Sequence, residues 1–161
     1  MLIKGLLLFH VELVVFFLFD LALLMKEPKG RYVTRDAITF LAEEFNYRNE
    51  DWMQDWEYIV ADYKDLNRYI ELYTTVTNDD IRFALMEMII ETSNEGWDLG
   101  WSTEIWPGVK QKLVDNFPLH EYTVYYWCYS LSDDIEDMFN ISPYMRDLWK
   151  ELTGTDFTST S

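Results

Sequence analysis

The chain has few of the residues from which metal and redox sites are built. It contains two histidines and one cysteine among 161 residues. The single Cys128 excludes an internal disulfide and is typical of a reducing compartment. His10 and His120 are too few for a zinc site of cysteines and histidines, and neither follows a glutamate by three residues, as di-iron bundles require. We therefore expect no metal and no cofactor.

Glycine is also scarce, and the six glycines form no catalytic motif. The chain has neither a Gly-rich phosphate loop nor a Gly-x-Ser-x-Gly turn. Cys128 lies eight residues after His120. That spacing is about 12 Å along one helix, too far for a thiolate–imidazole pair, so Cys128 is expected to be a buried structural residue. The acidic run at 133–137 lacks the central glycine of a calcium loop and is typical of a solvated helix start.

Two glutamates are the best candidates for acid–base catalysis. Glu87 and Glu91 stand one helical turn apart and could act together in a cleft. Their neighbours Met86, Met88 and Ile90 favour instead the outward edge of a buried helix. With no other catalytic pattern in the chain, we predict that the protein is not an enzyme.

Positively charged residues are also scarce. The 13 Lys and Arg residues face 29 Asp and Glu, which gives a net charge of −16 and an isoelectric point near 4.3. The positive residues are scattered, so the clustered footprint of a nucleic-acid-binding protein is absent. Because 49% of the residues are apolar and 17% aromatic, the chain can still fold around a core. We expect an acidic surface that repels nucleic acid and attracts basic proteins.

Only residues 5–24 form a long hydrophobic run, and three interpretations of it stay open. It could be a membrane anchor, although Glu12 and Asp20 each oppose insertion by up to about 3 kcal/mol. It could equally be a peripheral helix, or an upstream extension of a domain that begins at Met25. A signal peptide is disfavoured because no small-residue cleavage site follows. If the segment spans a membrane, the basic residues after it place the domain on the cytoplasmic face; otherwise we expect a cytoplasmic protein.

From Thr34 onward, the chain reads as short helices with capping residues at their starts. No sustained alternation typical of strands is present, and no Asn-Gly or Asp-Gly hairpin turn. The sequence therefore predicts an all-α fold, an irregular array of short antiparallel helices in one domain. We place this acidic domain at residues 25–152, after a hydrophobic segment at 1–24 and before a frayed tail at 153–161.

Two of the expected helices carry specific predictions. A helix starting at Asn49 has Glu50 and Asp51 in its first turn. The same helix presents a single apolar face of Trp52, Trp56, Ile59 and Tyr63. A later helix opened by Pro118 is apolar almost all round, which predicts the buried central helix of the fold.

The candidate binding residues are acids at helix starts and two loop tryptophans. Antiparallel neighbours alternate their ends, so alternate helices present their N-termini to one surface. We therefore expect one negative face made of Glu50, Asp51, Asp55, Asp79, Asp80, Asp133, Asp134 and Asp137. Trp97 and Trp101 lie in a Gly-containing loop, where they are either an interface hot spot or a lid over the core.

In size, charge and helical content over residues 32–152, the chain resembles the small acidic immunity proteins that neutralise bacterial nuclease toxins. The resemblance implies a single-domain binding protein that covers the basic cleft of a nuclease. It rests on no family motif, so it assigns no residues. The alternatives are a phage-type inhibitor or nucleic-acid mimic acting on a defence enzyme, a membrane-tethered helical adaptor, and a helical scaffold whose charge serves only solubility.

Overall fold

The structure is organised around one helix that is buried along most of its length. The computed structural model describes residues 27–96, 100, 104–128 and 138–157. In it, helix α5 spans Asp79–Glu95, and ten of its 17 residues are buried. The Asn78 side chain caps its start by accepting hydrogen bonds from the backbone N–H groups of Asp80 and Ile81, at 2.9 and 3.0 Å. Gly96 ends it.

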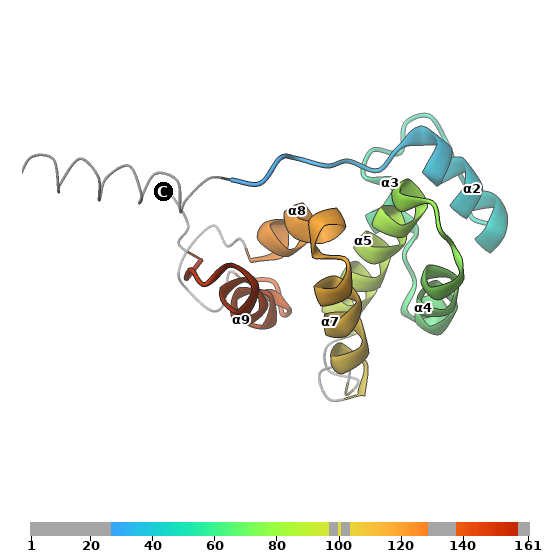
Figure 1. The fold of residues 1–161 in the computed structure, drawn as a ribbon. Coiled ribbons are helices and arrows are strands. Elements are labelled where there is room, and N and C mark those ends of the chain that lie inside the picture. The colour runs from blue at the N-terminus through green and yellow to red at the C-terminus, as the bar shows by residue number, and fades with distance from the viewer. Residues whose placement is uncertain (1–26, 97–99, 101–103, 129–137, 158–161) are drawn as a thin grey trace, which may run out of the picture.

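The other helices pack on two sides of α5 (Figure 1). Helices α2 (Arg35–Phe45), α3 (Trp56–Val60) and α4 (Leu66–Thr75) contact it on one side, and the short 3-10 turn η1 (Tyr63–Asp65) leads into α4. Helix α8 (Phe117–Trp127) contacts α5 on the other side and packs in turn against α7 (Trp106–Asp115) and α9 (Ser142–Thr153). Every regular element among the described residues is helical, so the all-α prediction is confirmed.

One hydrophobic core joins these helices. Helix α5 contributes the fully buried Leu85, Met88 and Ile90, among others. Trp56 and Trp127 fill the space on its two sides with exposures of 1% each. Burying aromatic side chains of this size supplies a large part of the hydrophobic stabilisation of a small helical domain.

Several helices begin at residues that favour a helix start, among them Thr34 and Pro118. Thr34 caps α2 by accepting a hydrogen bond from the backbone N–H of Ala37 at 3.3 Å. Pro107, Pro118 and Pro143 lie in the first turns of α7, α8 and α9, where the missing N–H costs no helical hydrogen bond.

The helix predicted from Asn49 is wrong in its start. Helix α3 begins only at Trp56, because Asp55 has a left-handed backbone (φ 52°) that a continuous helix does not allow. The preceding residues form tight turns, and the Trp52 indole donates to the Glu50 carboxylate at 2.6 Å. Trp52 is consequently 61% exposed, and the single apolar face predicted for Trp52, Trp56, Ile59 and Tyr63 does not form: of the four only Trp56 is buried.

The central helix was also misassigned. The sequence predicted the Pro118 helix, α8, for this position, but α5 occupies it. Helix α8 is buried on one side through Thr123, Val124 and Trp127, while Tyr126 is 39% exposed. Tyrosine tolerates this half-exposed position because its ring is apolar and its hydroxyl can reach water.

The two ends of the described chain make specific contacts. At the start, Arg31 forms an ion pair with Asp80 at 2.7 Å and lies over the Phe83 ring. At the end, the Phe157 ring lies 5.4 Å from that of Tyr125, and residues 158–161 of the expected frayed tail lie outside the described residues. The hydrophobic segment at 1–24 lies outside the described residues. Among those described, no helix combines the length and apolar character that crossing a membrane needs.

Two isoleucine-to-alanine substitutions test which helix carries the core. Ile90 is fully buried on α5, whereas Ile59 on α3 is 44% exposed. We expect Ile90→Ala to lower the free energy of unfolding by about 2–5 kcal/mol, because it leaves a cavity. The matched Ile59→Ala should cost about 0.5 kcal/mol or less. Urea denaturation measures both, and similar losses in the two variants would contradict the central position of α5.

Candidate functional site

The predicted acids among the described residues come from two parts of the chain. Glu50, Asp51 and Asp55 lie in the turns before α3, and Asp79 and Asp80 form the first turn of α5. Two of the five have arginine partners: Asp51 pairs with Arg35 at 2.5 Å, and Asp80 pairs with Arg31. Asp133, Asp134 and Asp137, together with Trp97 and Trp101, lie outside the described residues. The single negative face and the role of the two tryptophans therefore stay predictions.

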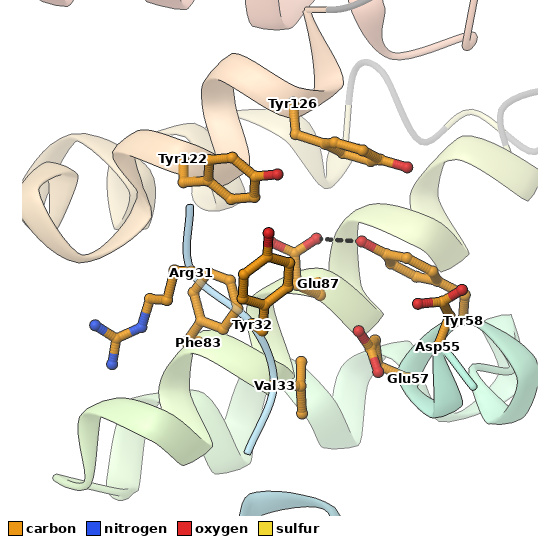
Figure 2. A pocket seen from close by; sticks show the side chains of 10 residues that line it. All are labelled: Arg31, Tyr32, Val33, Asp55, Glu57, Tyr58, Phe83, Glu87, Tyr122 and Tyr126. Atoms are coloured by element: carbon orange, nitrogen blue, oxygen red, sulfur yellow. Dashed lines mark hydrogen bonds between the residues drawn. The ribbon is translucent and has the colours of Figure 1, made fainter. Parts of the chain in front are cut away.

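A pocket of about 110 Å³ lies between α3, α5, α8 and the extended segment at 31–33. Of the predicted acids that the structure describes, Asp55 alone contributes to it. Figure 2 shows tyrosine rings from three parts of the chain around a group of carboxylates. The lining residues are Arg31, Tyr32, Val33, Asp55, Glu57, Tyr58, Phe83, Glu87, Tyr122 and Tyr126.

Glu87 is the innermost carboxyl of the pocket. It is 4% exposed, so its predicted place on the outward edge of the helix is wrong. Three side chains donate to it: the Tyr58 hydroxyl at 2.9 Å, the Thr123 hydroxyl at 2.5 Å and the Trp127 indole at 3.1 Å. Burial raises the pKa of Glu87, and the three hydrogen bonds only partly oppose that shift. Glu87 therefore links α3 and α8 to α5.

Glu57 is the second buried carboxyl of the pocket, and no other described residue donates a hydrogen bond to its side chain. It is 9% exposed and has no ion pair with another described residue. Burial raises the pKa of Glu57 to about 7, a hydrogen bond to the backbone of the same residue opposes this shift, and Glu87 and Asp55 raise the pKa further. A nearly buried carboxyl with so little compensation is unfavourable to folding, because one hydrogen bond within the residue only partly offsets its loss of water.

The outer edge of the pocket is a row of tyrosines, which we call the tyrosine rim: Tyr32, Tyr122 and Tyr126. The rings of Tyr32 and Tyr122 have centroids 6.3 Å apart, as do those of Tyr122 and Tyr126. Phe139 extends the row, 6.4 Å from Tyr126. Tyr32 is 77% exposed and Tyr126 39%, so the rim presents aromatic surface to solvent.

Two further buried polar groups lie outside this pocket. The His120 Nε2 and the Tyr73 hydroxyl are hydrogen-bonded at 2.8 Å, and burial lowers the pKa of His120 to about 3, so this histidine is neutral at physiological pH. Cys128 is fully buried, as predicted, and burial raises the pKa of its thiol far above neutrality. Neither group has the exposure of a reactive nucleophile. Within the described ranges, no three His, Cys, Asp or Glu residues are arranged to hold a metal ion.

Comparisons with protein-family models, curated proteins and solved structures find no match to this chain. The site must therefore be interpreted from its own geometry.

Sequence reasoning missed most of this pocket. Tyr122 and Tyr126 are four residues apart, which places them on one side of a helix. This spacing is the signal that could have located the rim. Glu57 gives no such signal, because an acid after Trp56 in a short helix is indistinguishable from a surface residue.

The pH dependence of stability tests the burial of Glu87. An ordinary glutamate titrates near pH 4.5, and the folded protein holds the Glu87 proton to higher pH. The contribution of this carboxyl to stability is therefore fully present below about pH 4.5, the pKa in the unfolded chain, and is lost as the pH rises through the raised pKa of the folded protein. We expect Glu87→Gln to lose less stability than the wild type between about pH 5.5 and about pH 8.

Urea denaturation at both pH values measures this difference. Glu71→Gln, which removes an exposed carboxylate on α4, is the control and should follow the wild type. The opposite pH dependence of His120 is common to all three proteins and cancels in the comparison. Equal slopes for Glu87→Gln and the wild type would contradict the raised pKa.

Proposed function

We propose that this chain is a non-enzymatic, acidic binding protein that occludes a basic partner. Within that class, we propose an immunity protein whose partner is a toxic nuclease. A nuclease needs a basic cleft to hold phosphate, and an array of carboxylates on a rigid domain competes for that cleft. The net charge of −16 supplies the attraction.

The observation that carries the proposal is how the positive residues are used. Five of them are in ion pairs, at Arg31, Arg35, Arg68, Lys110 and Lys150. Others lie over aromatic rings, such as Arg82 over Tyr73 and Arg146 over Phe157. These contacts occupy most of the described cations, so the excess of carboxylates faces solvent without compensation. Such a surface steers a basic protein toward it at long range.

Aromatic side chains near the acids support a specific interface over mere solubility. Trp52 is 61% exposed beside Glu50, and the tyrosine rim lies beside Asp55. Tryptophan and tyrosine contribute most to the affinity of protein interfaces. Charge that served only to keep a scaffold soluble would not need exposed aromatic residues beside it.

Capture from a lysate of the source organism, followed by an activity assay, tests the proposal. We expect the wild-type protein to retain a basic nuclease and to inhibit its cleavage of DNA or RNA at equimolar ratio. Retention of a defence enzyme encoded against phage would favour the phage-type inhibitor. Retention of acidic proteins or lipid alone would contradict the proposal and favour the adaptor.

Neutralising the acids before α3 should slow association with that partner. The triple variant Glu50→Gln, Asp51→Asn and Asp55→Asn keeps the side-chain shapes, and asparagine also suits the left-handed backbone at Asp55. We expect an association rate about tenfold lower at low salt, with a flatter salt dependence, because steering is electrostatic.

The matched control removes three exposed charges from separate helices, by Glu44→Gln, Glu71→Gln and Asp147→Asn. Stopped-flow association at several ionic strengths compares the two triples. If the two triples slow association equally, net charge alone acts and the acids before α3 are not part of the interface.

A further inference from the structure

The pocket has the size of a site for one side chain. Sites for drug-sized ligands enclose about 300–1,000 Å³, whereas this pocket has about 110 Å³. It is open to solvent at the tyrosine rim, where Tyr32 is largely exposed, and at Asp55, which is also exposed. A side chain from another protein can therefore enter it without rearrangement of the helices.

The chemistry of the walls suits a cation. The faces of tyrosine rings attract positive charge through their quadrupole. Figure 2 shows the rings of Tyr122 and Tyr126 on one side of the pocket, the carboxylates of Glu57 and Asp55 on the other, and the ring of Tyr32 near the centre of the view. A cation placed between them has aromatic surface and carboxylate oxygens within reach at once.

Glu57 is a second, independent indication of a missing ligand. Its side chain is nine-tenths buried, lines the pocket and has no hydrogen bond or ion pair with another described residue. Glu87, the other buried carboxyl, has three donors. Glu87 thus has three side-chain donors, whereas Glu57 has only the backbone of its own residue, and its remaining acceptor capacity is open to a donor from outside.

The cation of the pocket wall itself does not meet this need. Arg31 forms its ion pair with Asp80 and lies 5.2 Å above the centre of the Phe83 ring. In Figure 2 its guanidinium points away from Glu57 and Asp55. The carboxylates of Glu57 and Asp55 therefore remain available to a cation from outside.

We propose that this pocket binds the guanidinium of an arginine side chain on the partner protein. The inference rests on the proposed function, because it assumes that the partner is basic. Arginine fits better than lysine because a planar guanidinium stacks on tyrosine rings and donates to carboxylate oxygens at the same time. The tyrosine rim would provide the stacking surface, and Glu57 and Asp55 the acceptors.

A titration with a small probe tests the pocket without the partner. The probe is N-acetyl-arginine methylamide, added to the full chain and followed by two-dimensional ¹H–¹⁵N NMR. The control probe is the citrulline analogue, which has nearly the same shape and no charge. We expect saturable shifts in the amides of residues 55–58 and 122–126 with arginine, and none with citrulline at equal concentration. The lysine analogue should bind more weakly than arginine.

Substitutions then assign the acceptors. Glu57→Gln keeps the size of the side chain and should weaken arginine binding roughly tenfold, the effect of a lost charged hydrogen bond. Glu71→Gln, which removes one exposed charge from α4, should leave the affinity within about twofold, because screening reduces distant charges. If Glu57→Gln does not fold, Asp55→Asn at the exposed mouth of the pocket tests the same point and should also weaken binding.

The outcomes distinguish a failure of the arginine site from a failure of the proposed function. Equal shifts with citrulline, tighter binding of lysine, shifts elsewhere on the protein, or equal effects of Glu57→Gln and Glu71→Gln would each overturn the arginine site. Inhibition of a nuclease that is unchanged in Glu57→Gln would overturn the pocket and leave the function standing. Arginine binding in the pocket, with no nuclease inhibited, would leave the pocket standing and overturn the function.

Discussion

The burial of one carboxyl, Glu87, is the constraint on which the arrangement of the helices depends. A carboxyl without hydrogen bonds in the middle of a core helix is strongly unfavourable, so its partners must be held in place. Tyr58 comes from α3, and Thr123 and Trp127 come from α8, so these donors join the two sides of the fold through α5. Apolar packing alone would allow these helices to slide or rotate, because it is not directional. Three hydrogen bonds to one group restrict both movements.

The pocket is a geometric consequence of the same hydrogen bonds. Thr123 and Trp127 lie four residues apart on the inward side of α8, so Tyr122 and Tyr126, each one residue earlier, are turned about 100° around the helix toward its edge. Tyr58 likewise fixes its neighbour Glu57 at the pocket wall. The residues that bind Glu87 therefore also position those that face the pocket. A substitution at Glu87 should be understood as a change to the pocket as well as to the core.

Local signals predicted the fold better than the site. Thr34, Asn78 and the three prolines act within one helical turn, so their effects can be recognised from neighbouring residues alone. The start of α3 could not be recognised in this way, because nothing around Asp55 marks its left-handed backbone. Glu87 was misassigned because its donors are 29, 36 and 40 residues away in the sequence. A glutamate flanked by methionine and isoleucine has the same local sequence whether it is buried or lies at the edge of the helix.

The cost of Glu57 is the strongest argument that the pocket has a role beyond folding. An apolar residue of similar size at this nearly buried position would avoid the loss of water that a carboxyl suffers when its own backbone is its one donor among the described residues. The nearby carboxyls of Asp55 and Glu87 add to that cost by raising the pKa of Glu57 further. Natural proteins retain such unfavourable groups mainly where binding or chemistry requires them. A positive side chain from a partner would remove the cost at the moment of association, so part of the folding stability lost at Glu57 would reappear as affinity.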